Sequence, residues 1–214
     1  EMLSQIYQIQ KDTKERVSNI IVMGMGEPLD NYEELLRFIK LVSCEKGIGI
    51  SQRNITVSTC GLVDKIRMLA DEKLQITLAI SLHAPNDEIR RQTMPIANRY
   101  TIGEIIQACK YYFDKTGRRI TFEYSMIRGV NDKEEHAKEL AGRLSGLNCH
   151  INLIPLNEVK ERNCYRSTKE DIEKFKSILE KYRKTVTIRR EMGSDIDAAC
   201  GQLRKKFLTK NGRN

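Results

Sequence analysis

The sequence predicts an α/β fold in which about six parallel strands alternate with helices that lie outside the sheet. Two observations support this prediction. Strand-like and helix-like segments alternate along the 214 residues, which is the pattern of parallel sheets connected by helices. The strand-like segments are near-continuous apolar runs, which indicates burial on both faces of the sheet. A doubly wound sheet and a barrel both fit, although a complete eight-stranded barrel typically needs about 250 residues.

The predicted strands are short, often β-branched segments that run into glycine-rich or polar sequence. They are expected at residues 19–23, 53–58, 75–82, 119–126, 149–156 and 185–189. In both candidate folds the active site lies at the carboxyl ends of the parallel strands. The residues that directly follow each strand are therefore the first candidates for a chemical role.

The predicted helices carry apolar residues at helical spacing and recognisable starting signals. Capping boxes, in which a hydroxyl and a carboxylate satisfy exposed backbone N–H groups, are expected at 101–104 and 167–170. The polar pair at 30–31 and the side chain of Asn131 are expected to cap two further helices. The first residues read as the start of a helix, not as a signal peptide, which favours a chain that begins inside a domain. A last helix is expected from Ile196.

The charge of the chain is positive and unevenly distributed. The formal net charge is +8, and residues 158–214 hold 16 Lys or Arg against 9 Asp or Glu. Such asymmetry favours a polyanionic partner such as nucleic acid, because Lys and Arg neutralise phosphates and release counterions. A merely basic, soluble surface explains the charge equally well. No apolar run approaches the roughly 18 residues of a membrane-spanning helix, so no membrane partner is expected.

The cysteines are widely spaced along the chain. They are Cys44, Cys60, Cys109, Cys149, Cys164 and Cys200, and no two are closer than 15 positions apart. This spacing matches neither a zinc site nor an iron–sulfur site, so no metal ligands are expected in this chain. With no secretory signal, the thiols are expected to be reduced in a cytoplasmic protein, and most of them to be small buried side chains.

Glycine-rich sequence follows the first predicted strand. Gly24 and Gly26 would let the backbone approach a ligand closely, and Glu27 supplies an acceptor for a ligand ammonium group. The spacing is not that of a dinucleotide-binding G-x-G-x-x-G loop. A tight strand–helix turn with a solvated Glu27 is the alternative interpretation.

Polar side chains also follow the later strands. Ser58 ends the second predicted strand, where a hydroxyl binds a polar ligand or, as the local sequence favours, caps the next helix. Ser81 and His83 lie at the end of the third strand, although a lone histidine is more often structural than catalytic. Asn157 follows the fifth strand and can pair with a heterocycle or a ribose, or close a turn.

Small residues surround Cys200, so that its sulfur would be open to a bulky substrate. A thiolate is a strong nucleophile when its surroundings lower its pKa. The local sequence taken alone favours the opposite interpretation, an inert cysteine in the core.

Taken together, six segments resemble the RlmN/Cfr family of radical-SAM methylases, in the same order and at suitable separations. The segments are 24–28, 58–61, 81–87, 129–132, 152–157 and 195–203. The last segment is very distinctive, and the resemblance covers nearly the whole chain, to about Leu203. Pro28 and the Leu-His-Ala-Pro-Asn-Asp run favour the RlmN side of the family, which methylates adenine C2, over Cfr, whose methylation is directed at C8.

The resemblance implies a partial TIM-type barrel of the radical-SAM type that lacks its first strand and its cluster loop. It also implies S-adenosylmethionine and a 4Fe-4S cluster as cofactors. The implied S-adenosylmethionine contacts are Gly26, Glu27, Ser58, Ser81, Leu82, His83 and Asn157. Gly26 and Glu27 would hold the methionine amino group. Residues 1–214 would form a single domain, with 1–203 in the barrel and 204–214 as a basic tail.

The activity that the resemblance implies is methylation of C2 of an adenine in 23S ribosomal RNA, with transfer RNA as a further candidate substrate. Cys200 would carry the methyl group, because C2 is an electron-poor carbon on which ordinary nucleophilic methyl transfer fails. It would take the methyl group from one S-adenosylmethionine, and a radical made from a second would activate that group. The family's C-x-x-x-C-x-x-C cluster motif is absent, so the cluster ligands are expected upstream of Glu1. The chain alone is expected to be an inactive fragment.

The remaining expectations concern partners and alternatives. A monomer is expected, with an electron donor such as flavodoxin for the full-length enzyme. Cys60 stands where related sequences often have serine, and it has no predicted role. Two alternatives stay open: an adenine-C8 methylase of the same family, and a non-catalytic, basic RNA-binding α/β domain.

Overall fold

The structure of the chain is a computed structural model that describes residues 1–157 and 165–190. Three expectations therefore lie outside the described residues: the helix from Ile196, the role of Cys200 and the basic tail at 204–214.

In the described part of the chain, a single sheet of six parallel strands forms the centre of the molecule. The strands are β1 Ile20–Val22, β2 Ile55–Thr59, β3 Thr77–Ser81, β4 Ile120–Met126, β5 Cys149–Pro155 and β6 Thr185–Ile188. Their order in the sheet is the same as their order in the sequence, and every neighbouring pair is parallel. A doubly wound sheet reverses its strand order at a switch point, and this sheet does not, so the barrel-type alternative is confirmed.

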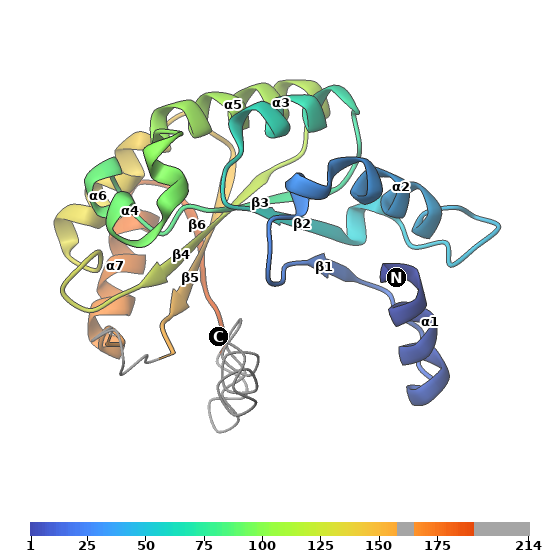
Figure 1. The fold of residues 1–214 in the computed structure, drawn as a ribbon. Helices are drawn as coiled ribbons and strands as arrows, with labels where there is room; N and C mark the ends of the chain where they lie inside the picture. Colours follow the sequence, from blue (N-terminus) through green and yellow to red (C-terminus); the bar gives the residue numbers. More distant parts are fainter. Residues whose placement is uncertain (158–164, 191–214) are drawn as a thin grey trace, which may run out of the picture.

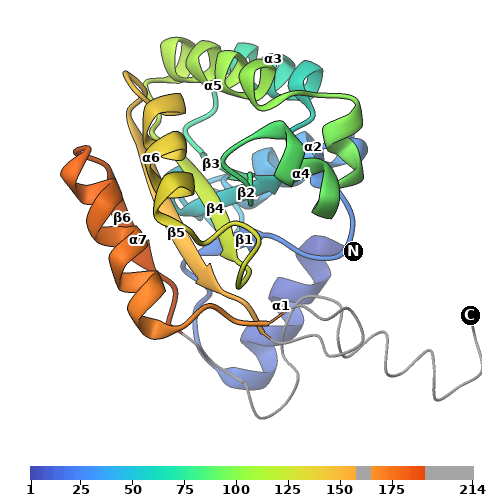
Figure 2. The same ribbon diagram turned by 90° about the vertical axis from the view of Figure 1, so that its left-hand side faces the viewer.

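Helices connect the strands and cover the outer side of the curved sheet, except the first helix, which precedes the first strand (Figure 1). The helices are α1 Met2–Thr13, α2 Tyr32–Val42, α3 Val63–Asp71, α4 Asp87–Thr93, α5 Ile102–Thr116, α6 Glu134–Arg143 and α7 Lys169–Lys181, with short 3-10 turns at Pro28–Asn31, Gln52–Asn54 and Pro95–Asn98. The two ribbon views show α2, α3, α5, α6 and α7 arching over one side of the sheet (Figures 1 and 2). The other side stays open, because the first and last strands do not meet (Figure 1). The fold is therefore a partial barrel, as predicted.

The hydrophobic core lies between the outer face of the sheet and these helices. The strand side chains that point into it are fully buried: Ile55, Val57, Leu78, Ile80, Ile120, Phe122, Tyr124, Ile151 and Leu153 are all 0% exposed. The ring centroids of Tyr124 and Phe175 lie 5.3 Å apart, which shows that Tyr124 faces α7. Because side chains alternate along a strand, the intervening residues face the inner, open side.

The prediction of burial on both faces holds only for the central strands. In β1 and β6 the inner-facing residues are exposed; Ile21 is 65% exposed. In β5 the inner-facing positions are partly exposed and polar, as at His150 and Asn152. A closed barrel would cover these positions, whereas an open sheet leaves its inner edge strands in contact with solvent.

The helix caps confirm one predicted box and correct two other predictions. The box at 101–104 forms, because Thr101 and Glu104 each accept a hydrogen bond from the other's backbone N–H. The second box does not form as predicted, since Thr168 rather than Ser167 caps α7, by accepting a hydrogen bond from the N–H of Asp171. Asn131 does not cap α6, which begins at Glu134. The short helix α4 and the 3-10 turns were not predicted.

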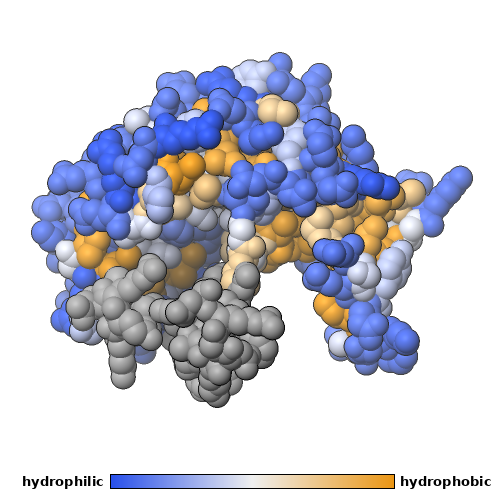
Figure 3. Space-filling view, viewed as in Figure 1, coloured by the Kyte–Doolittle hydropathy of each residue, from blue (hydrophilic) through white to orange (hydrophobic). Residues whose placement is uncertain are grey.

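Hydrophobic residues also gather around β1 and α1 on the face shown in Figure 3. A cavity of about 620 Å³ lies there, lined by α1, β1, α2 and the loop that contains Gly26 and Glu27. Within the described ranges, no helix is both long and apolar enough to cross a membrane.

Candidate active site at the carboxyl edge of the sheet

The loop after β1 takes a backbone shape that requires glycine. Gly26 has φ +106°, a region that side chains with a Cβ rarely adopt. A Cβ built on Gly26 would meet nothing within 4 Å, so the requirement is conformational and the space beside it is open. The sequence prediction of a glycine that lets a ligand approach the backbone therefore has its geometric basis here.

Glu27 follows this glycine and ties the loop to its neighbour. Its Oε1 accepts a hydrogen bond from Leu29 N at 3.0 Å, and its Oε2 accepts one from Cys60 N at 2.7 Å. The carboxylate thus joins the loop after β1 to the loop after β2. The alternative of a solvated Glu27 is wrong, although a carboxylate has further acceptor positions for a ligand.

Cys60 lies beside that carboxylate, and its thiol is held in the protonated form. Burial, followed by the hydrogen bond to Glu27 and the charge of Glu27, raises the pKa of Cys60 to about 12. A thiol with such a pKa carries almost no thiolate at neutral pH. The structure therefore gives Cys60 no nucleophilic role, and the sequence predicted none.

Ser58 and Ser81 face the inner side of the sheet at its carboxyl edge. Each follows a fully buried, outward-facing residue of its strand, and Ser58 is itself 6% exposed. Helix α3 has Leu62 as its N-cap and no side-chain cap. The capping alternative for Ser58 is therefore wrong, and its hydroxyl remains available to a ligand.

His83 is fixed in one orientation and one tautomer. Its Nδ1 accepts a hydrogen bond from Ser125 N at 3.0 Å, and its backbone has φ +57°. Removal of the ring from water, together with the charge of Arg90, lowers the pKa of His83 to about 4. The imidazole is therefore neutral at physiological pH with its proton on Nε2, which makes Nε2–H a hydrogen-bond donor.

Arg90 in α4 holds the ends of β2 and β3 together, and the sequence analysis did not identify it. Its side chain is fully buried. It donates to Cys60 O at 2.6 Å, to Leu82 O at 3.2 Å, to Ser81 O at 3.4 Å and to Tyr100 O at 3.5 Å. A buried guanidinium bonded to several carbonyls fixes the path of both loops. No local pattern singles out this arginine among the others of its helix.

Gly61 makes room for that arrangement. It has φ +101°, and a Cβ there would lie 2.8 Å from Ile105 Cδ1 and 3.5 Å from Arg90 Nη2. A larger residue would push against Ile105 of α5 and would touch the guanidinium at ordinary contact distance. The glycine after Cys60 is thus needed both for backbone conformation and for close packing.

Asn131 supports His83 from the loop after β4. Its Nδ2 donates to His83 O at 2.8 Å and to Ser125 O at 2.7 Å, and its Oδ1 accepts from Ile127 N at 2.7 Å. Asn131 is 0% exposed. The segment that the sequence analysis expected to begin a helix instead braces the edge of the sheet.

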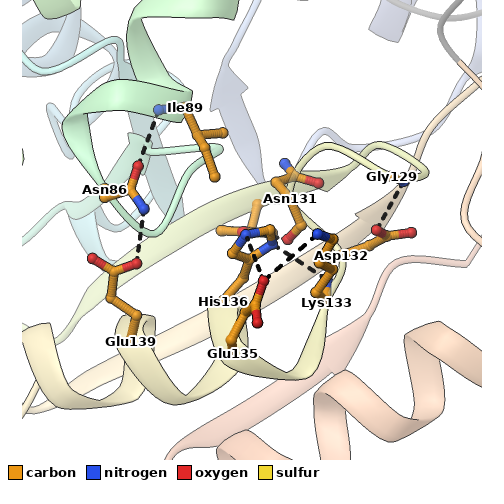
Figure 4. Close-up of polar contacts among 10 residues, drawn as sticks. Asn86, Ile89, Gly129, Asn131, Asp132, Lys133, Glu135, His136 and Glu139 are labelled. Atoms are coloured by element: carbon orange, nitrogen blue, oxygen red, sulfur yellow. Dashed lines mark hydrogen bonds and ion pairs between the residues drawn. The ribbon is translucent and has the colours of Figure 1, made fainter.

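The same edge is linked to α6 by a second asparagine. Asn86 caps α4, since its Oδ1 accepts from Ile89 N at 3.0 Å, and its Nδ2 donates to Glu139 Oε2 at 2.8 Å (Figure 4). Asp132 accepts a hydrogen bond from Gly129 N at 2.9 Å and so closes the turn that follows β4 (Figure 4). The first contact joins the loop after β3 to α6, and the second stays within the loop after β4.

The remaining predicted cofactor contacts, Leu82 and Asn157, differ in how far they are exposed. Leu82 is 0% exposed and its side chain belongs to the core, so only its backbone can reach a ligand. Asn157 lies two residues beyond β5 and is partly exposed. The structure brings the residues of the first three strand ends together through Glu27 and Arg90, whereas Cys200 lies outside the described residues.

The described part of the chain holds no group of three or more His, Cys, Asp or Glu side chains that could bind a metal ion. The buried thiols of Cys109 and Cys149 lie on the outer, helix-covered side of the fold. The donor set near the carboxyl edge is therefore made of hydroxyl, imidazole, carboxylate and backbone groups, which suit a polar organic ligand.

Comparison with protein families gives a match to the Radical SAM superfamily over residues 3–141. Two similar curated proteins are each described as a "Probable dual-specificity RNA methyltransferase RlmN". The protein from Lachnospira eligens is 62% identical over 208 residues, which is 97% of this chain and 59% of that protein. The one from Lachnoclostridium phytofermentans is 60% identical over 210 residues, 98% of this chain and 59% of its own length. The chain thus spans about three fifths of these relatives.

Solved structures that resemble this chain point to the same superfamily. A radical SAM methyltransferase from Sphaerobacter thermophilus has a TM-score of 0.87 and 46% identity, over 94% of this chain and 59% of that protein. A domain of pyruvate-formate lyase-activating enzyme from Bacteroides vulgatus shares the fold, with a TM-score of 0.61 and 21% identity over 81% of this chain and the whole of that domain. The strand order, the glycine-shaped loop beside Glu27 and the family match over residues 3–141 agree: this chain belongs to the radical SAM superfamily.

Proposed function

We propose that the full-length protein is an RlmN-type radical-SAM methyltransferase that methylates C2 of an adenine in 23S ribosomal RNA. The observation that carries the proposal is the meeting of the loops after β1, β2 and β3 at one edge, bonded through Glu27 and Arg90. The order of the six family-like segments and the identity of about 60% to the curated relatives support it.

The residues at this edge fit S-adenosylmethionine, which membership of the superfamily implies as a cofactor. Gly26 leaves open space beside its backbone, and Glu27 is an acceptor for the methionine ammonium group. Ser81 offers a hydroxyl on the inner face, and His83 offers its Nε2–H as a donor. When bound, S-adenosylmethionine supplies the methyl group and the adenosyl group that the proposed chemistry needs.

The superfamily also implies a 4Fe-4S cluster, and the described residues do not fit one. Such clusters are held by cysteine thiolates. The cysteines of this chain are at least 15 positions apart, and the described residues contain no metal-binding group. We therefore derive no step through the cluster, and we propose that its ligands belong to sequence upstream of Glu1.

Of the two cysteines Cys60 and Cys200, only Cys200 would take part in the proposed chemistry. The Cys200 thiolate would accept a methyl group by forming an S–C bond, while the methyl group's former sulfur leaves with the electron pair as a neutral thioether. Cys60 would stay out of this step, because its raised pKa keeps it protonated and therefore a poor nucleophile. Glu27 and His83 would orient the ligand.

The proposal also covers the partners of the full-length protein. The relatives' name, dual-specificity RNA methyltransferase, supports a second RNA substrate, for which we propose transfer RNA. The excess of Lys and Arg in residues 158–214 supports contact with a polyanion. We further propose a cytoplasmic monomer that receives electrons from a donor such as flavodoxin.

The test uses the full-length protein and its Cys200→Ala variant, with Cys44→Ala as the matched control. Cys44 is exposed and lies outside the predicted site segments. The wild type and Cys44→Ala should transfer a methyl group to a 23S ribosomal RNA fragment, and mass spectrometry of the digested RNA should give 2-methyladenosine. Cys200→Ala should give none.

The outcome separates the alternatives. Methylation by Cys200→Ala at the wild-type level would refute the proposed role of that thiol. Methylation at C8 would assign the protein to the other branch of the family. RNA binding without methyl transfer by the reconstituted wild type would favour the non-catalytic alternative.

A further inference from the structure

A row of hydrogen-bonded polar side chains crosses the inner face of the sheet from β4 to β6. Asn152 Nδ2 donates to Glu123 Oε2 at 2.9 Å, and Thr187 Oγ1 donates to Asn152 Oδ1 at 3.1 Å. His150 Nε2 lies 2.9 Å from Thr187 Oγ1. The row is not among the residues that the sequence analysis selected, and the outer-facing residues on either side of Glu123 are fully buried apolar or aromatic residues of the core.

The strand register places this row level with the proposed cofactor contact Ser81. Ser81 is the direct partner of Glu123, Glu123 is the partner of Asn152, and Asn152 is the partner of Thr187. Directly opposite residues on neighbouring strands lie on the same face about 5 Å apart. Glu123 is also joined to the loop after β3, because its backbone oxygen accepts hydrogen bonds from Leu82 N and His83 N.

Every hydrogen bond of the row is donated in the direction of Glu123. Thr187 uses its hydroxyl proton on Asn152, so Thr187 can only accept from His150, which fixes the His150 proton on Nε2. Asn152 accepts from Thr187 and donates to Glu123. The row therefore ends on the Glu123 carboxylate, which when ionised has only acceptor positions.

Burial of Glu123 costs stability, which argues against a purely structural role. Glu123 is only 6% exposed. Removal from water raises the pKa of Glu123, and the hydrogen bond from Asn152 and the charge of Arg189 offset this only in part. Among the described residues, Oε2 is bonded to Asn152, and Oε1 has no hydrogen-bond partner but is not one of the fully buried atoms. Oε1 is therefore an acceptor that a ligand on the inner face can reach.

We propose that Glu123 is a ligand-binding residue of this site, whose Oε1 accepts a hydrogen bond from an adenosine moiety seated against the inner face. Asn152, Thr187 and His150 are positioning residues that hold the carboxylate in place. This inference rests on the proposed function, because that function supplies the ligand chemistry. An acceptor-only group needs a ligand with N–H or O–H donors, and adenosine carries such donors on its exocyclic amine and its ribose.

Both reactants of the proposed reaction contain adenosine, so two sources are distinguished by experiment. One source is S-adenosylmethionine, and the other is the substrate nucleotide of the RNA. The position of Glu123 beside Ser81 and His83 fits either source. Separate measurements with each ligand on the same variant assign the contact.

Glu123→Gln in the full-length protein is the sharpest variant. Glutamine has the same shape but a single acceptor oxygen, which Asn152 would occupy, so the NH₂ group would face the donor of the ligand. Loss of a buried hydrogen bond to a charged group weakens binding by about 10- to 100-fold. Because the wild-type carboxylate is buried, the thermal unfolding midpoint of Glu123→Gln should equal or exceed that of the wild type.

The measurements are the dissociation constant of S-adenosylmethionine without RNA, that of a short 23S ribosomal RNA hairpin without S-adenosylmethionine, and the unfolding midpoint. A loss of affinity for the first ligand alone assigns the contact to the cofactor, and a loss for the second alone assigns it to the RNA. Thr187→Val, which releases Asn152, should cause a smaller loss for the same ligand. Thr121→Val, on the same strand and face two residues earlier, is the control and should change neither.

Two results would overturn the inference. One is Glu123→Gln affinity within twofold of the wild type for both ligands. The other is a fall in the unfolding midpoint large enough to explain the lost binding through the unfolded fraction, with Thr187→Val binding both ligands normally. If the wild type itself binds neither ligand, the proposed function fails instead, so the two failures are distinguishable.

Discussion

The two faces of the central sheet are built from the same strands but carry different chemistry. The outer face of β4 presents Phe122 and Tyr124, which are 0% exposed and packed under helices. The inner face of the same strand presents Glu123 and Ser125, whose carboxylate and backbone bind Asn152 and His83. Alternation along a strand makes this division automatic.

The comparison indicates where stability and function reside in this fold. Outer-face side chains remove apolar area from water, which is the main favourable term in folding. Inner-face side chains keep polar atoms at the open side of the sheet, where they contribute less to stability and are available to ligands. Substitutions on the outer face should therefore mainly change stability, and substitutions on the inner face should mainly change ligand binding.

The largest loss of stability is expected from the outer face. Phe122→Ala removes a fully buried ring and leaves a cavity between β4 and its neighbours, which should cost about 3–5 kcal/mol of unfolding free energy. Urea denaturation of the full-length protein followed by circular dichroism measures it. A cost below about 1 kcal/mol would show that the outer face is not the main source of stability.

Arg90 lies at the carboxyl edge of the sheet, between the core and the candidate site. Its loss should therefore lower both the stability of the protein and its affinity for the ligand. Arg90→Met keeps the length of the side chain but leaves the carbonyls of Cys60, Ser81 and Leu82 without their donor. The expected cost is about 3 kcal/mol, together with weaker binding of S-adenosylmethionine. Arg91→Met on the exposed side of the same helix is the control, and equal effects of the two variants would contradict the assignment.

The stability of the protein should depend on pH through His83 on the inner side of the sheet. Its pKa is about 4 in the folded protein against 6.5 as the ordinary value, so the unfolded chain binds more protons between these limits. Stability should therefore be fully present above about pH 6.5 and fall as the pH drops toward 4, by up to about 1.4 kcal/mol per pH unit. Denaturation curves of the wild type and His83→Asn at pH 7 and pH 5 test this. The wild type should lose more stability than the variant, and parallel losses would be inconsistent with the lowered pKa.

The smallest change in stability is expected at the inner rim. Ser81→Ala removes a hydroxyl from a partly exposed position, so its unfolding free energy should stay within about 0.5 kcal/mol of the wild type. Its affinity for S-adenosylmethionine should nevertheless fall by about 3- to 10-fold, the worth of one neutral hydrogen bond. Isothermal titration with the full-length protein checks this, and Ser43→Ala in the loop after α2 is the control.

Most of the fold was accessible from the sequence because each strand and helix has its own periodicity. All six strands lie within two residues of the predicted limits, and the box at Thr101 and Glu104 forms as expected. The prediction for Asn131 was wrong because a local pattern cannot tell a helix cap from a side chain that reaches a neighbouring loop. Its contact with His83 spans 48 residues of sequence.

The sequence indicated candidate residues that follow the strands, and their binding roles stay predictions. Gly26, Glu27 and Ser58 have surroundings that suit a ligand, while Leu82 can contribute only its backbone. Arg90 was missed because an arginine in an amphipathic helix has no local mark of burial. Only the packing of three loops around it makes it a structural centre.

The sequence by itself determined the alternation of strands and helices, the parallel sheet and the edge at which chemistry is expected, because these follow from hydrophobic periodicity and from residues adjacent in the chain. The tertiary structure decided which polar groups meet: Glu27 with Cys60, Arg90 with the ends of β2 and β3, and Glu123 with Asn152. The pairs Glu27–Cys60, Arg90–Cys60 and Glu123–Asn152 are 33, 30 and 29 positions apart. Their contact depends on strand register and loop packing, which are set by the whole core and not by any local segment.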